Sequence, residues 1–131
     1  MLKTLPDTPE RAQHELTLQI TLGTAFIATK SYSAPEVGIA YTRARELCQQ
    51  TGETAQLFPV LGGLWQFHIV RAEYQITREL GELILSLAQN ERDPAFLLVE
   101  AHDALGQTFC FLGELSQAQA HLEQGILLYD P

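Results

Sequence analysis

The sequence predicts an all-α fold in which about three antiparallel helical hairpins stack into an α-solenoid, and three observations support this prediction. Helix-initiating residues recur along the chain at intervals that suit helices of about 15 to 20 residues. Only short breaks separate the helical segments, and short connections force neighbouring helices to run antiparallel. No segment of the sequence shows the period-two alternation of a β-strand flanked by hairpin-turn residues.

The first hairpin is predicted over about residues 7–52. Both of its helices begin with a capping-box pattern, in which an Asp or Ser precedes a proline and a glutamate follows three residues after the cap. The pattern at Asp7 predicts a helix over residues 9–29. The pattern at Ser33 predicts a second helix that ends at Gly52, since glycine is the residue that most easily closes a helix.

The second hairpin is predicted over about residues 53–90. Its first helix begins near Glu53 and ends at about Arg71. Pro59 is tolerated only in the opening turns of a helix, so a kink or a late start is expected there. The second helix of this hairpin covers about residues 74–89.

The third hairpin is predicted over about residues 93–131. Asp93 has the position of an N-cap, and the proline after it suits the first turn of a helix over residues 94–112. Gly113 ends that helix. A third capping box begins at Ser116 and opens the last helix.

Composition and charge limit the classes of protein and partner. A chain of 131 residues with 46% hydrophobic content suffices for one domain, predicted to cover residues 1–131. The net charge of −8 would repel a phosphate backbone, so nucleic acid is not expected as a partner. No run of about 18 apolar residues predicts a membrane span, and the N-terminus lacks an apolar signal core, so a cytoplasmic location is expected.

The acidic residues and the cysteines give two further expectations. Residues 53–131 carry three basic and eleven acidic side chains, which indicates either a basic partner or a solvated polar face. Cys48 and Cys110 lie 62 residues apart in apolar surroundings without a C-x-x-C pairing. We expect both to be free thiols in the core of a protein from a reducing compartment.

An internal repeat relates the hairpins. The second and third hairpins share small and large apolar positions at a constant offset of 41 residues. The matched positions are Gly63, Leu64, Trp65, Ala72, Thr77 and Gly81 with Ala104, Leu105, Gly106, Gly113, Ala118 and Leu122, and the first hairpin adds Leu22, Gly23 and Phe26. Small residues at a crossing let two helices touch, so this pattern resembles that of tetratricopeptide repeats, with helices longer than the usual unit.

A resemblance to a particular class of protein covers almost the whole chain. The segments that carry it are 5–11, 15–16, 22–23, 35–37, 45–48, 63–65, 87–89, 101–106 and 128–131. They resemble the helical-repeat region of large bacterial proteins that join a nucleotide cyclase or regulatory domain to a signalling ATPase. The resemblance implies a sensing and scaffolding role, with nucleotide chemistry upstream, and implies that this chain is a fragment. Thr77 and His68 depart from the pattern, which predicts looser packing in the second hairpin.

No group of residues predicts catalysis, a cofactor or a metal. The four histidines include no i, i+4 ligand pair, and His102 does not share a helix face with its acidic neighbours in sequence. The glycine pair at residues 62–63 lacks the context of a phosphate loop and suits a helix crossing. Trp65, Phe67 and Tyr74 are expected in the core rather than on a ligand platform. We therefore expect a protein that is not an enzyme.

The candidate partner surface is the inner face formed by the first helix of each hairpin. It comprises Thr17, Ile20, Thr24, Gln66, Ile69, Glu100, Asp103 and Gln107. These residues suit a protein-binding or intramolecular scaffolding module for a protein or peptide, and they lack the Lys and Asn set that grips a chaperone's C-terminal carboxylate. The alternative is a small-molecule sensor that regulates an upstream ATPase or cyclase.

A homodimer is expected through the last helix. Leu115, Ala118, Leu122, Ile126 and Tyr129 form a broad face suited to packing within its own hairpin. Leu127 and Leu128 extend the apolar surface beyond that face, and we expect a second copy to cover them.

Overall fold

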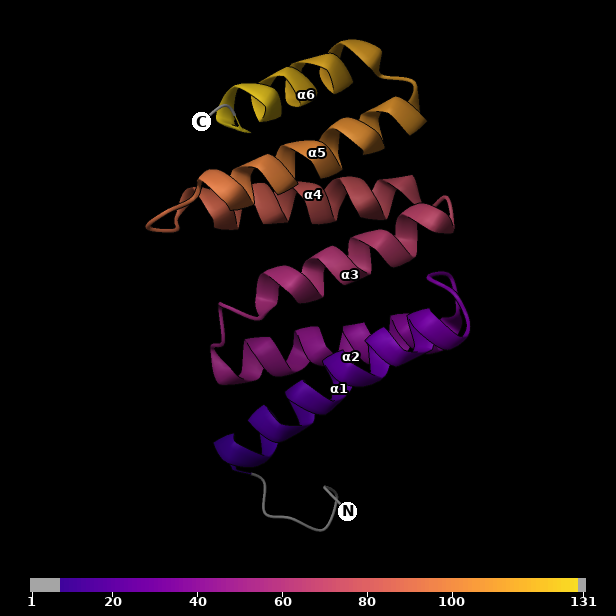
Figure 1. The fold of residues 1–131 in the computed structure, drawn as a ribbon, viewed down its shortest axis with the longest axis vertical. Coiled ribbons are helices and arrows are strands. Elements are labelled where there is room, and N and C mark those ends of the chain that lie inside the picture. The colour runs from indigo at the N-terminus through magenta and orange to yellow at the C-terminus, as the bar shows by residue number, and fades with distance from the viewer. Residues whose placement is uncertain (1–7, 130–131) are drawn as a thin grey trace. The chain divides into compact units, whose positions relative to one another are not determined.

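A computed structural model describes residues 8–129 of the chain, and every regular element in this range is an α-helix (Figure 1). The helices are α1 (Pro9–Thr29), α2 (Pro35–Thr51), α3 (Leu57–Val70), α4 (Tyr74–Gln89), α5 (Ala95–Leu112) and α6 (Leu115–Tyr129). The prediction of an all-α fold is confirmed, and the bounds of α1 and α4 are those predicted.

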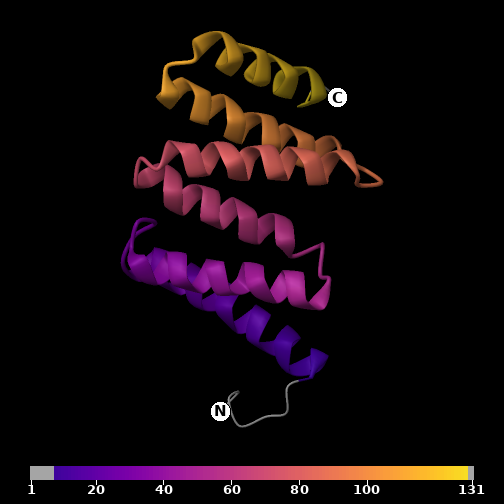
Figure 2. The ribbon, with the colours of Figure 1, turned by 180° about the vertical axis from the view of Figure 1, so that it is seen from behind.

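The chain divides into two compact units, unit 1 (Met1–Val70) with α1 to α3 and unit 2 (Arg71–Pro131) with α4 to α6. Within each unit, helices that follow one another in sequence pack together and run antiparallel (Figures 1 and 2). The division falls between α3 and α4, inside the second predicted hairpin. The single domain over residues 1–131 remains a prediction.

The N-caps of four helices lie one or two residues from their predicted positions. Thr8, in an extended conformation, caps α1, and its Oγ1 accepts a hydrogen bond from the backbone N–H of Arg11 at 3.2 Å; Asp7 lies outside the described residues. Ala34 occupies the N-cap of α2, so the capping box predicted at Ser33 does not form. In both helices the proline takes the first helical position, and the cap is therefore the residue directly before it.

The starts of α5 and α6 also correct the predictions. Pro94 rather than Asp93 takes the N-cap of α5. Helix α6 begins at Leu115, because the carbonyl of Glu114 already accepts the first intrahelical bond, from Ala118 at 3.0 Å. Ser116 therefore lies inside the first turn and cannot cap it. Helix α3 starts late, at Leu57, as the proline in its third position predicts.

Three helices end in the left-handed turn that favours glycine. Gly52 after α2 and Gly113 after α5 have φ of 71° and 80°, which confirms both predicted ends. Ala72, after α3, has φ of 61°. This alanine is the counterpart of Gly113 at the offset of 41 residues, so the repeat extends to the backbone conformation. An alanine pays a steric cost there that glycine does not.

Unit 1 is packed around the aromatic ring of Tyr41 on α2. A Cβ atom added at Gly23 of α1 would lie 2.8 Å from Cε2 of this ring, and one added at Gly63 of α3 would lie 2.8 Å from Cε1. The ring therefore fits between two glycines on two different helices. The Phe67 ring packs in the same way against Gly38, where an added Cβ would lie 2.6 Å from its Cζ atom. Glycine at these crossings lets the aromatic rings occupy the space of a side chain.

A bidentate ion pair adds to the contact between α1 and α2. Arg43 donates from Nε to Oε2 of Glu15 at 2.8 Å and from Nη2 to Oε1 at 3.0 Å. The hydrogen bond from Arg43 holds the pKa of Glu15 below its ordinary value, against the opposing effect of burial. The parallel donors match the planar carboxylate, which fixes the orientation of the two helices.

At the glycine crossings of unit 2, leucines take the place of aromatic rings. Leu105 of α5 fills the space above Gly81 of α4, where an added Cβ would lie 2.8 Å from its Cδ2 atom. Leu122 of α6 fills the space above Gly106 of α5, where the corresponding distance is 2.5 Å. Each leucine therefore fills one glycine crossing. Leu105 also belongs to a buried core cluster with Phe109 of α5 and Ala118 of α6, against which Leu85 of α4 packs.

Thr77 does not loosen its surroundings within unit 2. Its side chain is completely buried, and its hydroxyl donates to the carbonyl of Tyr74 at 2.9 Å. The hydroxyl of Thr108, on α5, lies 3.2 Å away and completes a polar contact between the two helices. The larger side chain is thus accommodated because its polar atom has partners.

The cysteines differ from one another. Cys48 is buried as predicted, and burial raises the pKa of its thiol. The expectation that Cys110 lies in the core is wrong, because this residue is exposed. It follows Asp103 and Gln107 by seven and three residues on α5 and so continues their exposed stripe.

Candidate functional site

The part of the candidate surface on α1 has its hydroxyl groups already engaged. Thr17 and Thr24 are exposed, and Ile20 is half-buried. Each threonine hydroxyl donates to the backbone carbonyl one turn earlier, at 3.2 and 3.0 Å. The Thr24 hydroxyl also lies 3.4 Å from the hydroxyl of Tyr41, which gives this residue a role in packing unit 1.

The part of the surface on α3 lies beside buried aromatic residues. Gln66 and Ile69 are half-buried and one turn apart. Trp65 directly precedes Gln66 and Phe67 directly follows it, and both are buried. This confirms their prediction as core residues. Tyr74 is only half-buried, on α4, where its ring stacks on Phe111 of α5 at a centroid distance of 5.2 Å.

The part of the surface on α5 is the most open. Glu100, Asp103 and Gln107 are exposed and follow one another at three- and four-residue intervals, which places them on one helix face. The Gln107 side-chain amide donates to Oδ2 of Asp103 at 3.0 Å. Within the described residues no basic side chain forms an ion pair with Glu100 or Asp103.

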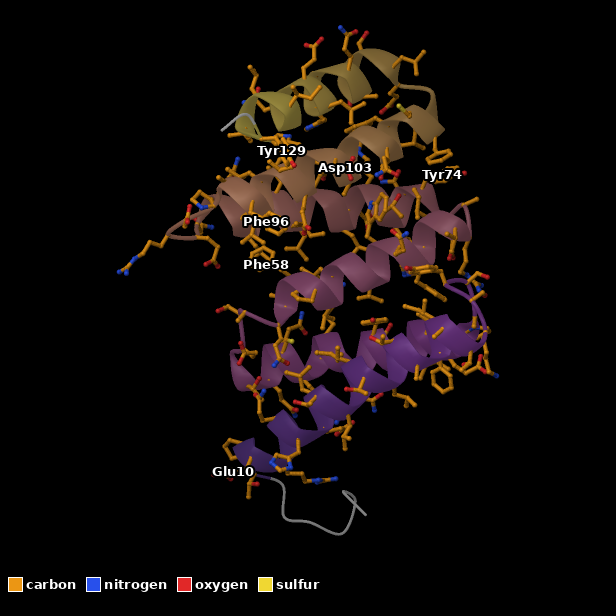
Figure 3. The ribbon with its side chains drawn as sticks, in the orientation of Figure 1. Glu10, Phe58, Tyr74, Phe96, Asp103 and Tyr129 are labelled. Atoms are coloured by element: carbon orange, nitrogen blue, oxygen red, sulfur yellow. The ribbon has the colours of Figure 1, made fainter. Side chains whose placement is uncertain are left out.

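Glu100 and Asp103 line a groove between α5 and α6, which we call the α5–α6 groove. Its volume is about 550 Å³, and it is lined by Val99, Glu100, Asp103, Leu122, Gly125, Ile126 and Tyr129. Figure 3 shows Asp103 and Tyr129 on the two helices that form it. The lining is mainly apolar, and its two charged members are both carboxylates. The volume falls in the range of sites that hold small ligands or large side chains.

Three of the residues that α6 contributes to this groove, Leu122, Ile126 and Tyr129, were predicted to pack within the hairpin, and for the last two that prediction is wrong. Ile126 is 70% exposed and Tyr129 is 77% exposed. The spacing of Leu122, Ile126 and Tyr129 does place them on one face of the helix. Of the residues predicted on that face, only Ala118 is buried. Leu127 is exposed as expected, whereas Leu128 is half-buried. Helix α5 covers only part of the apolar face of α6, and the uncovered part forms a wall of the groove.

A pair of histidines joins α5 and α6 beside this groove. The Nδ1 atoms of His102 and His121 lie 3.0 Å apart, so one imidazole donates and the other accepts. The His121 ring also stacks on the Phe109 ring, with 5.5 Å between the two centroids. The Arg78 guanidinium lies over the same Phe109 ring, 5.3 Å from its centroid. Burial lowers the pKa of both histidines, and for His102 the neighbouring His121 adds to this.

The histidine pair was not found in the sequence, where only ligand spacings within one helix were considered. Its members stand 19 residues apart and meet because α5 and α6 run antiparallel. Two imidazoles do not make a metal centre, and no group of three or more His, Cys, Asp or Glu side chains in residues 8–129 is placed to hold a metal ion. Among the described helices none is long and apolar enough to cross a membrane.

Comparison with known proteins identifies the fold. No protein-family model matches the chain, and no curated protein matches its sequence. Among solved structures, the tetratricopeptide domain of the Arabidopsis protein FLU is similar, with a TM-score of 0.79 and 18% sequence identity over 88% of this chain and 95% of that domain. This similarity confirms the predicted class, an α-solenoid of tetratricopeptide-like helical hairpins.

Proposed function

We propose that this chain, with its tetratricopeptide-like fold, is a non-catalytic protein-binding module. One observation carries the proposal: α5 presents exposed polar side chains, at Glu100 and Asp103, along the edge of a mainly apolar groove. A combination of apolar surface and a few placed polar groups is what recognition of a peptide or protein segment requires. Repeated helical hairpins supply such surfaces in many unrelated proteins, so the fold agrees with this role without naming the partner.

The cellular context of the module is proposed from the sequence resemblance. We propose that it acts in the cytoplasm as the scaffolding part of a bacterial signalling protein, and that it binds either another protein or other domains of its own parent chain. The candidate surface comprises Thr17, Ile20, Thr24, Gln66, Ile69, Glu100, Asp103 and Gln107. Neither nucleic acid nor a membrane is proposed as a partner, because the net charge of −8 is unfavourable for both anionic surfaces.

A second candidate function is small-molecule sensing coupled to an upstream ATPase or cyclase. The observation that favours it is the volume of the α5–α6 groove, about 550 Å³, which suits a small ligand as well as a peptide. The wide opening and the exposure of Ile126 and Tyr129 favour the peptide, because small-molecule sites usually enclose most of their ligand.

Affinity capture followed by measurement with the purified partner tests the proposal. Substitution of Glu100 or Asp103 by lysine is expected to weaken partner binding at least tenfold while the helical circular dichroism stays unchanged. The matched controls are Gln49→Lys and Glu79→Lys, at exposed positions on α2 and α4 outside the candidate surface, which should leave the affinity within about twofold. Catalytic turnover by the purified chain, or equal effects of all four substitutions, would contradict the proposal.

Self-association is proposed as a property of the same end of the chain. Leu127 and Leu128 extend the apolar surface of α6 beyond the α5–α6 groove, and Leu127 is 70% exposed. We propose that a second copy covers this outer face of α6. Light scattering over a concentration series, repeated with Leu127→Glu and Leu128→Glu, tests it: a parent chain that remains monomeric at high concentration would contradict the proposed dimer.

A further inference from the structure

The α5–α6 groove combines an apolar lining with negative charge at its edge. Val99, Leu122, Ile126 and Tyr129 provide apolar surface from both helices. The carboxylates of Glu100 and Asp103 lie one turn apart on α5, so they line one side of the groove. A ligand that buries an apolar group between the helices would therefore pass directly beside two anionic groups.

The charge at this edge is not neutralised by the rest of unit 2. Residues 71–131 contain three basic and ten acidic side chains. Of the basic residues, Arg71 pairs with Glu73 and Arg78 pairs with Glu82, and none of the three lines the groove. An anionic site surrounded by further anionic residues attracts cations and repels anions. This selects the sign of the charge on the occupant.

The same charge argues against a second copy of this chain in the groove. The α6 of a copy presents Glu123 at an exposed position directly after Leu122, one of the apolar residues that would dock. Docking of α6 into the groove would place this carboxylate against Glu100 and Asp103, which opposes association at this site; the outer face of α6, proposed above to contact a second copy, carries neither residue. A partner that is both basic and apolar avoids this repulsion.

We propose that the α5–α6 groove binds a basic amphipathic helix of a partner protein. Apolar side chains of that helix enter the groove between α5 and α6, where they contact Ile126 and Tyr129. Its flanking Lys or Arg side chains pair with Glu100 and Asp103. An amphipathic helix in an apolar groove is a recurrent mode of recognition, in which apolar anchors give affinity and charged pairs at the edge give specificity. The proposal rests on the protein-binding function proposed above and names the class of partner.

Gly125 provides a way to close the groove without touching its charges. A Cβ atom added there would lie 3.7 Å from Cβ of His102 and 3.9 Å from the carbonyl oxygen of Val99, which are ordinary contacts. Gly125→Ala should therefore leave the groove open. Gly125→Leu should fill it, and both substitutions replace a glycine inside a helix, which favours helix formation.

The test uses a synthetic amphipathic peptide of leucine and lysine, about four helical turns long, with fluorescence anisotropy of the peptide as the readout. The first control peptide has glutamate in place of each lysine. The second has the same composition as the test peptide in an order without an amphipathic face. The full chain should bind the leucine and lysine test peptide with a Kd in the micromolar range, and each of the two control peptides at least tenfold more weakly.

The protein variants divide the expected binding into its two parts. Glu100→Gln with Asp103→Asn should weaken binding of the Leu/Lys peptide about tenfold, and high salt should remove most of the difference. The matched charge control, Glu79→Gln with Glu114→Gln, removes two exposed carboxylates outside the groove and should change the affinity less than twofold. Gly125→Leu should abolish binding and Gly125→Ala should preserve it.

A further variant covers the case in which Gly125→Leu does not fold. Ile126→Lys changes a residue that is 70% exposed and places a positive charge in the groove, so it should fold and should also abolish binding. Equal binding of all three peptides, or full binding by Gly125→Leu or Ile126→Lys, would overturn the proposal. The proposed function would survive such a result if lysine at Glu100 or Asp103 still weakened binding of the captured partner, so the two failures are distinguishable.

Discussion

Units 1 and 2 follow the same rule of helix packing with different side chains. In unit 1 the ring of Tyr41 fits between Gly23 and Gly63, so one side chain joins three helices. In unit 2 two leucines, Leu105 and Leu122, each fill the space above one glycine at one helix crossing. The difference shows that glycine at a helix crossing does not specify its partner. It specifies that a large side chain must come from the facing helix, and an aromatic ring can satisfy two such positions at once.

The largest expected effect follows from the double role of Tyr41. Tyr41→Ala removes a ring that is 6% exposed and leaves space at two helix crossings. It should lower the free energy of unfolding by about 4 kcal/mol, the range found for buried aromatic residues. Leu122→Ala, at one crossing and only half-buried, should cost about 1 to 2 kcal/mol. Urea denaturation followed by circular dichroism measures both.

A second probe makes that comparison specific to one unit. The chain has one tryptophan, Trp65, which is buried in unit 1. Its fluorescence should report the loss caused by Tyr41→Ala and change little for Leu122→Ala. If both variants shifted the tryptophan transition equally, the distinction between the units would be wrong.

The helices and their packing could be predicted to different degrees. Helix positions depend on local patterns, namely prolines in the first turn, glycines at the ends and apolar periodicity, and these gave α1 and α4 their full extent. The identity of the residue facing each glycine depends on the alignment of different helices. The repeat identified Gly23 and Gly63 as crossing positions, but no local signal pointed to Tyr41 as the partner of both.

The candidate site was predicted in part for the same reason. Glu100 and Asp103 were named because the first helix of each hairpin was expected to form the inner face of the stack, and the structure shows both side chains exposed. The groove was missed because the exposure of Ile126 and Tyr129 depends on how much of α6 is covered by α5, and periodicity alone does not give that amount. The exposed position of Cys110 was available from the sequence, since it continues the same helical stripe.

A smaller effect separates the two kinds of packing by overfilling them. Gly63→Ala would place a Cβ against one edge of the Tyr41 ring, whose other edge already packs against Gly23, so the ring has no room to shift. The substitution should lower the free energy of unfolding by about 2 kcal/mol. Gly106→Ala would place one even nearer to Leu122, at 2.5 Å. Leu122 borders the α5–α6 groove and has room to shift, and alanine favours the helix by about 1 kcal/mol, so the net change should be close to zero.

Thermal unfolding of these two variants gives the answer directly. A clear loss for Gly63→Ala beside a near-neutral Gly106→Ala would support a rigid aromatic contact in unit 1 and an adaptable leucine contact in unit 2. Equal losses would show that Leu122 is as constrained as Tyr41, and the proposed difference in rigidity would fail.

The repeated turn between helices offers a still smaller test. Ala72 has φ of 61° and Gly113 has φ of 80°, and both are exposed, so side-chain packing contributes little at either position. Ala72→Gly should raise the free energy of unfolding by about 0.5 to 1 kcal/mol, and Gly113→Ala should lower it by about 1 kcal/mol. Chemical denaturation of both single variants measures the two shifts. Changes of the same sign would contradict a shared left-handed turn.

The smallest expected effect is a dependence on pH that is confined to unit 2. Burial lowers the pKa of His102 and His121 in the folded chain, so the unfolded chain binds more protons as the pH falls through the ordinary histidine pKa of about 6.5. Stability contributed by the neutral pair is therefore present above that pH and is lost below it. Protonation of both rings would also remove the acceptor from their 3.0 Å contact, and the attraction of Glu82 for a protonated His121 only partly opposes this loss.

The measurement compares unfolding at about pH 7.5 and pH 5.5, a range in which histidines titrate and most carboxylates do not. Circular dichroism should show a lower unfolding midpoint at the acidic pH, whereas the fluorescence of Trp65 in unit 1 should respond less. The double variant His102→Gln with His121→Gln keeps neutral polar side chains at both positions, and its midpoint should lose most of this pH dependence. An unchanged dependence in the double variant would place the responsible groups elsewhere, and the histidine pair would then be a contact without a role in the acid sensitivity of unit 2.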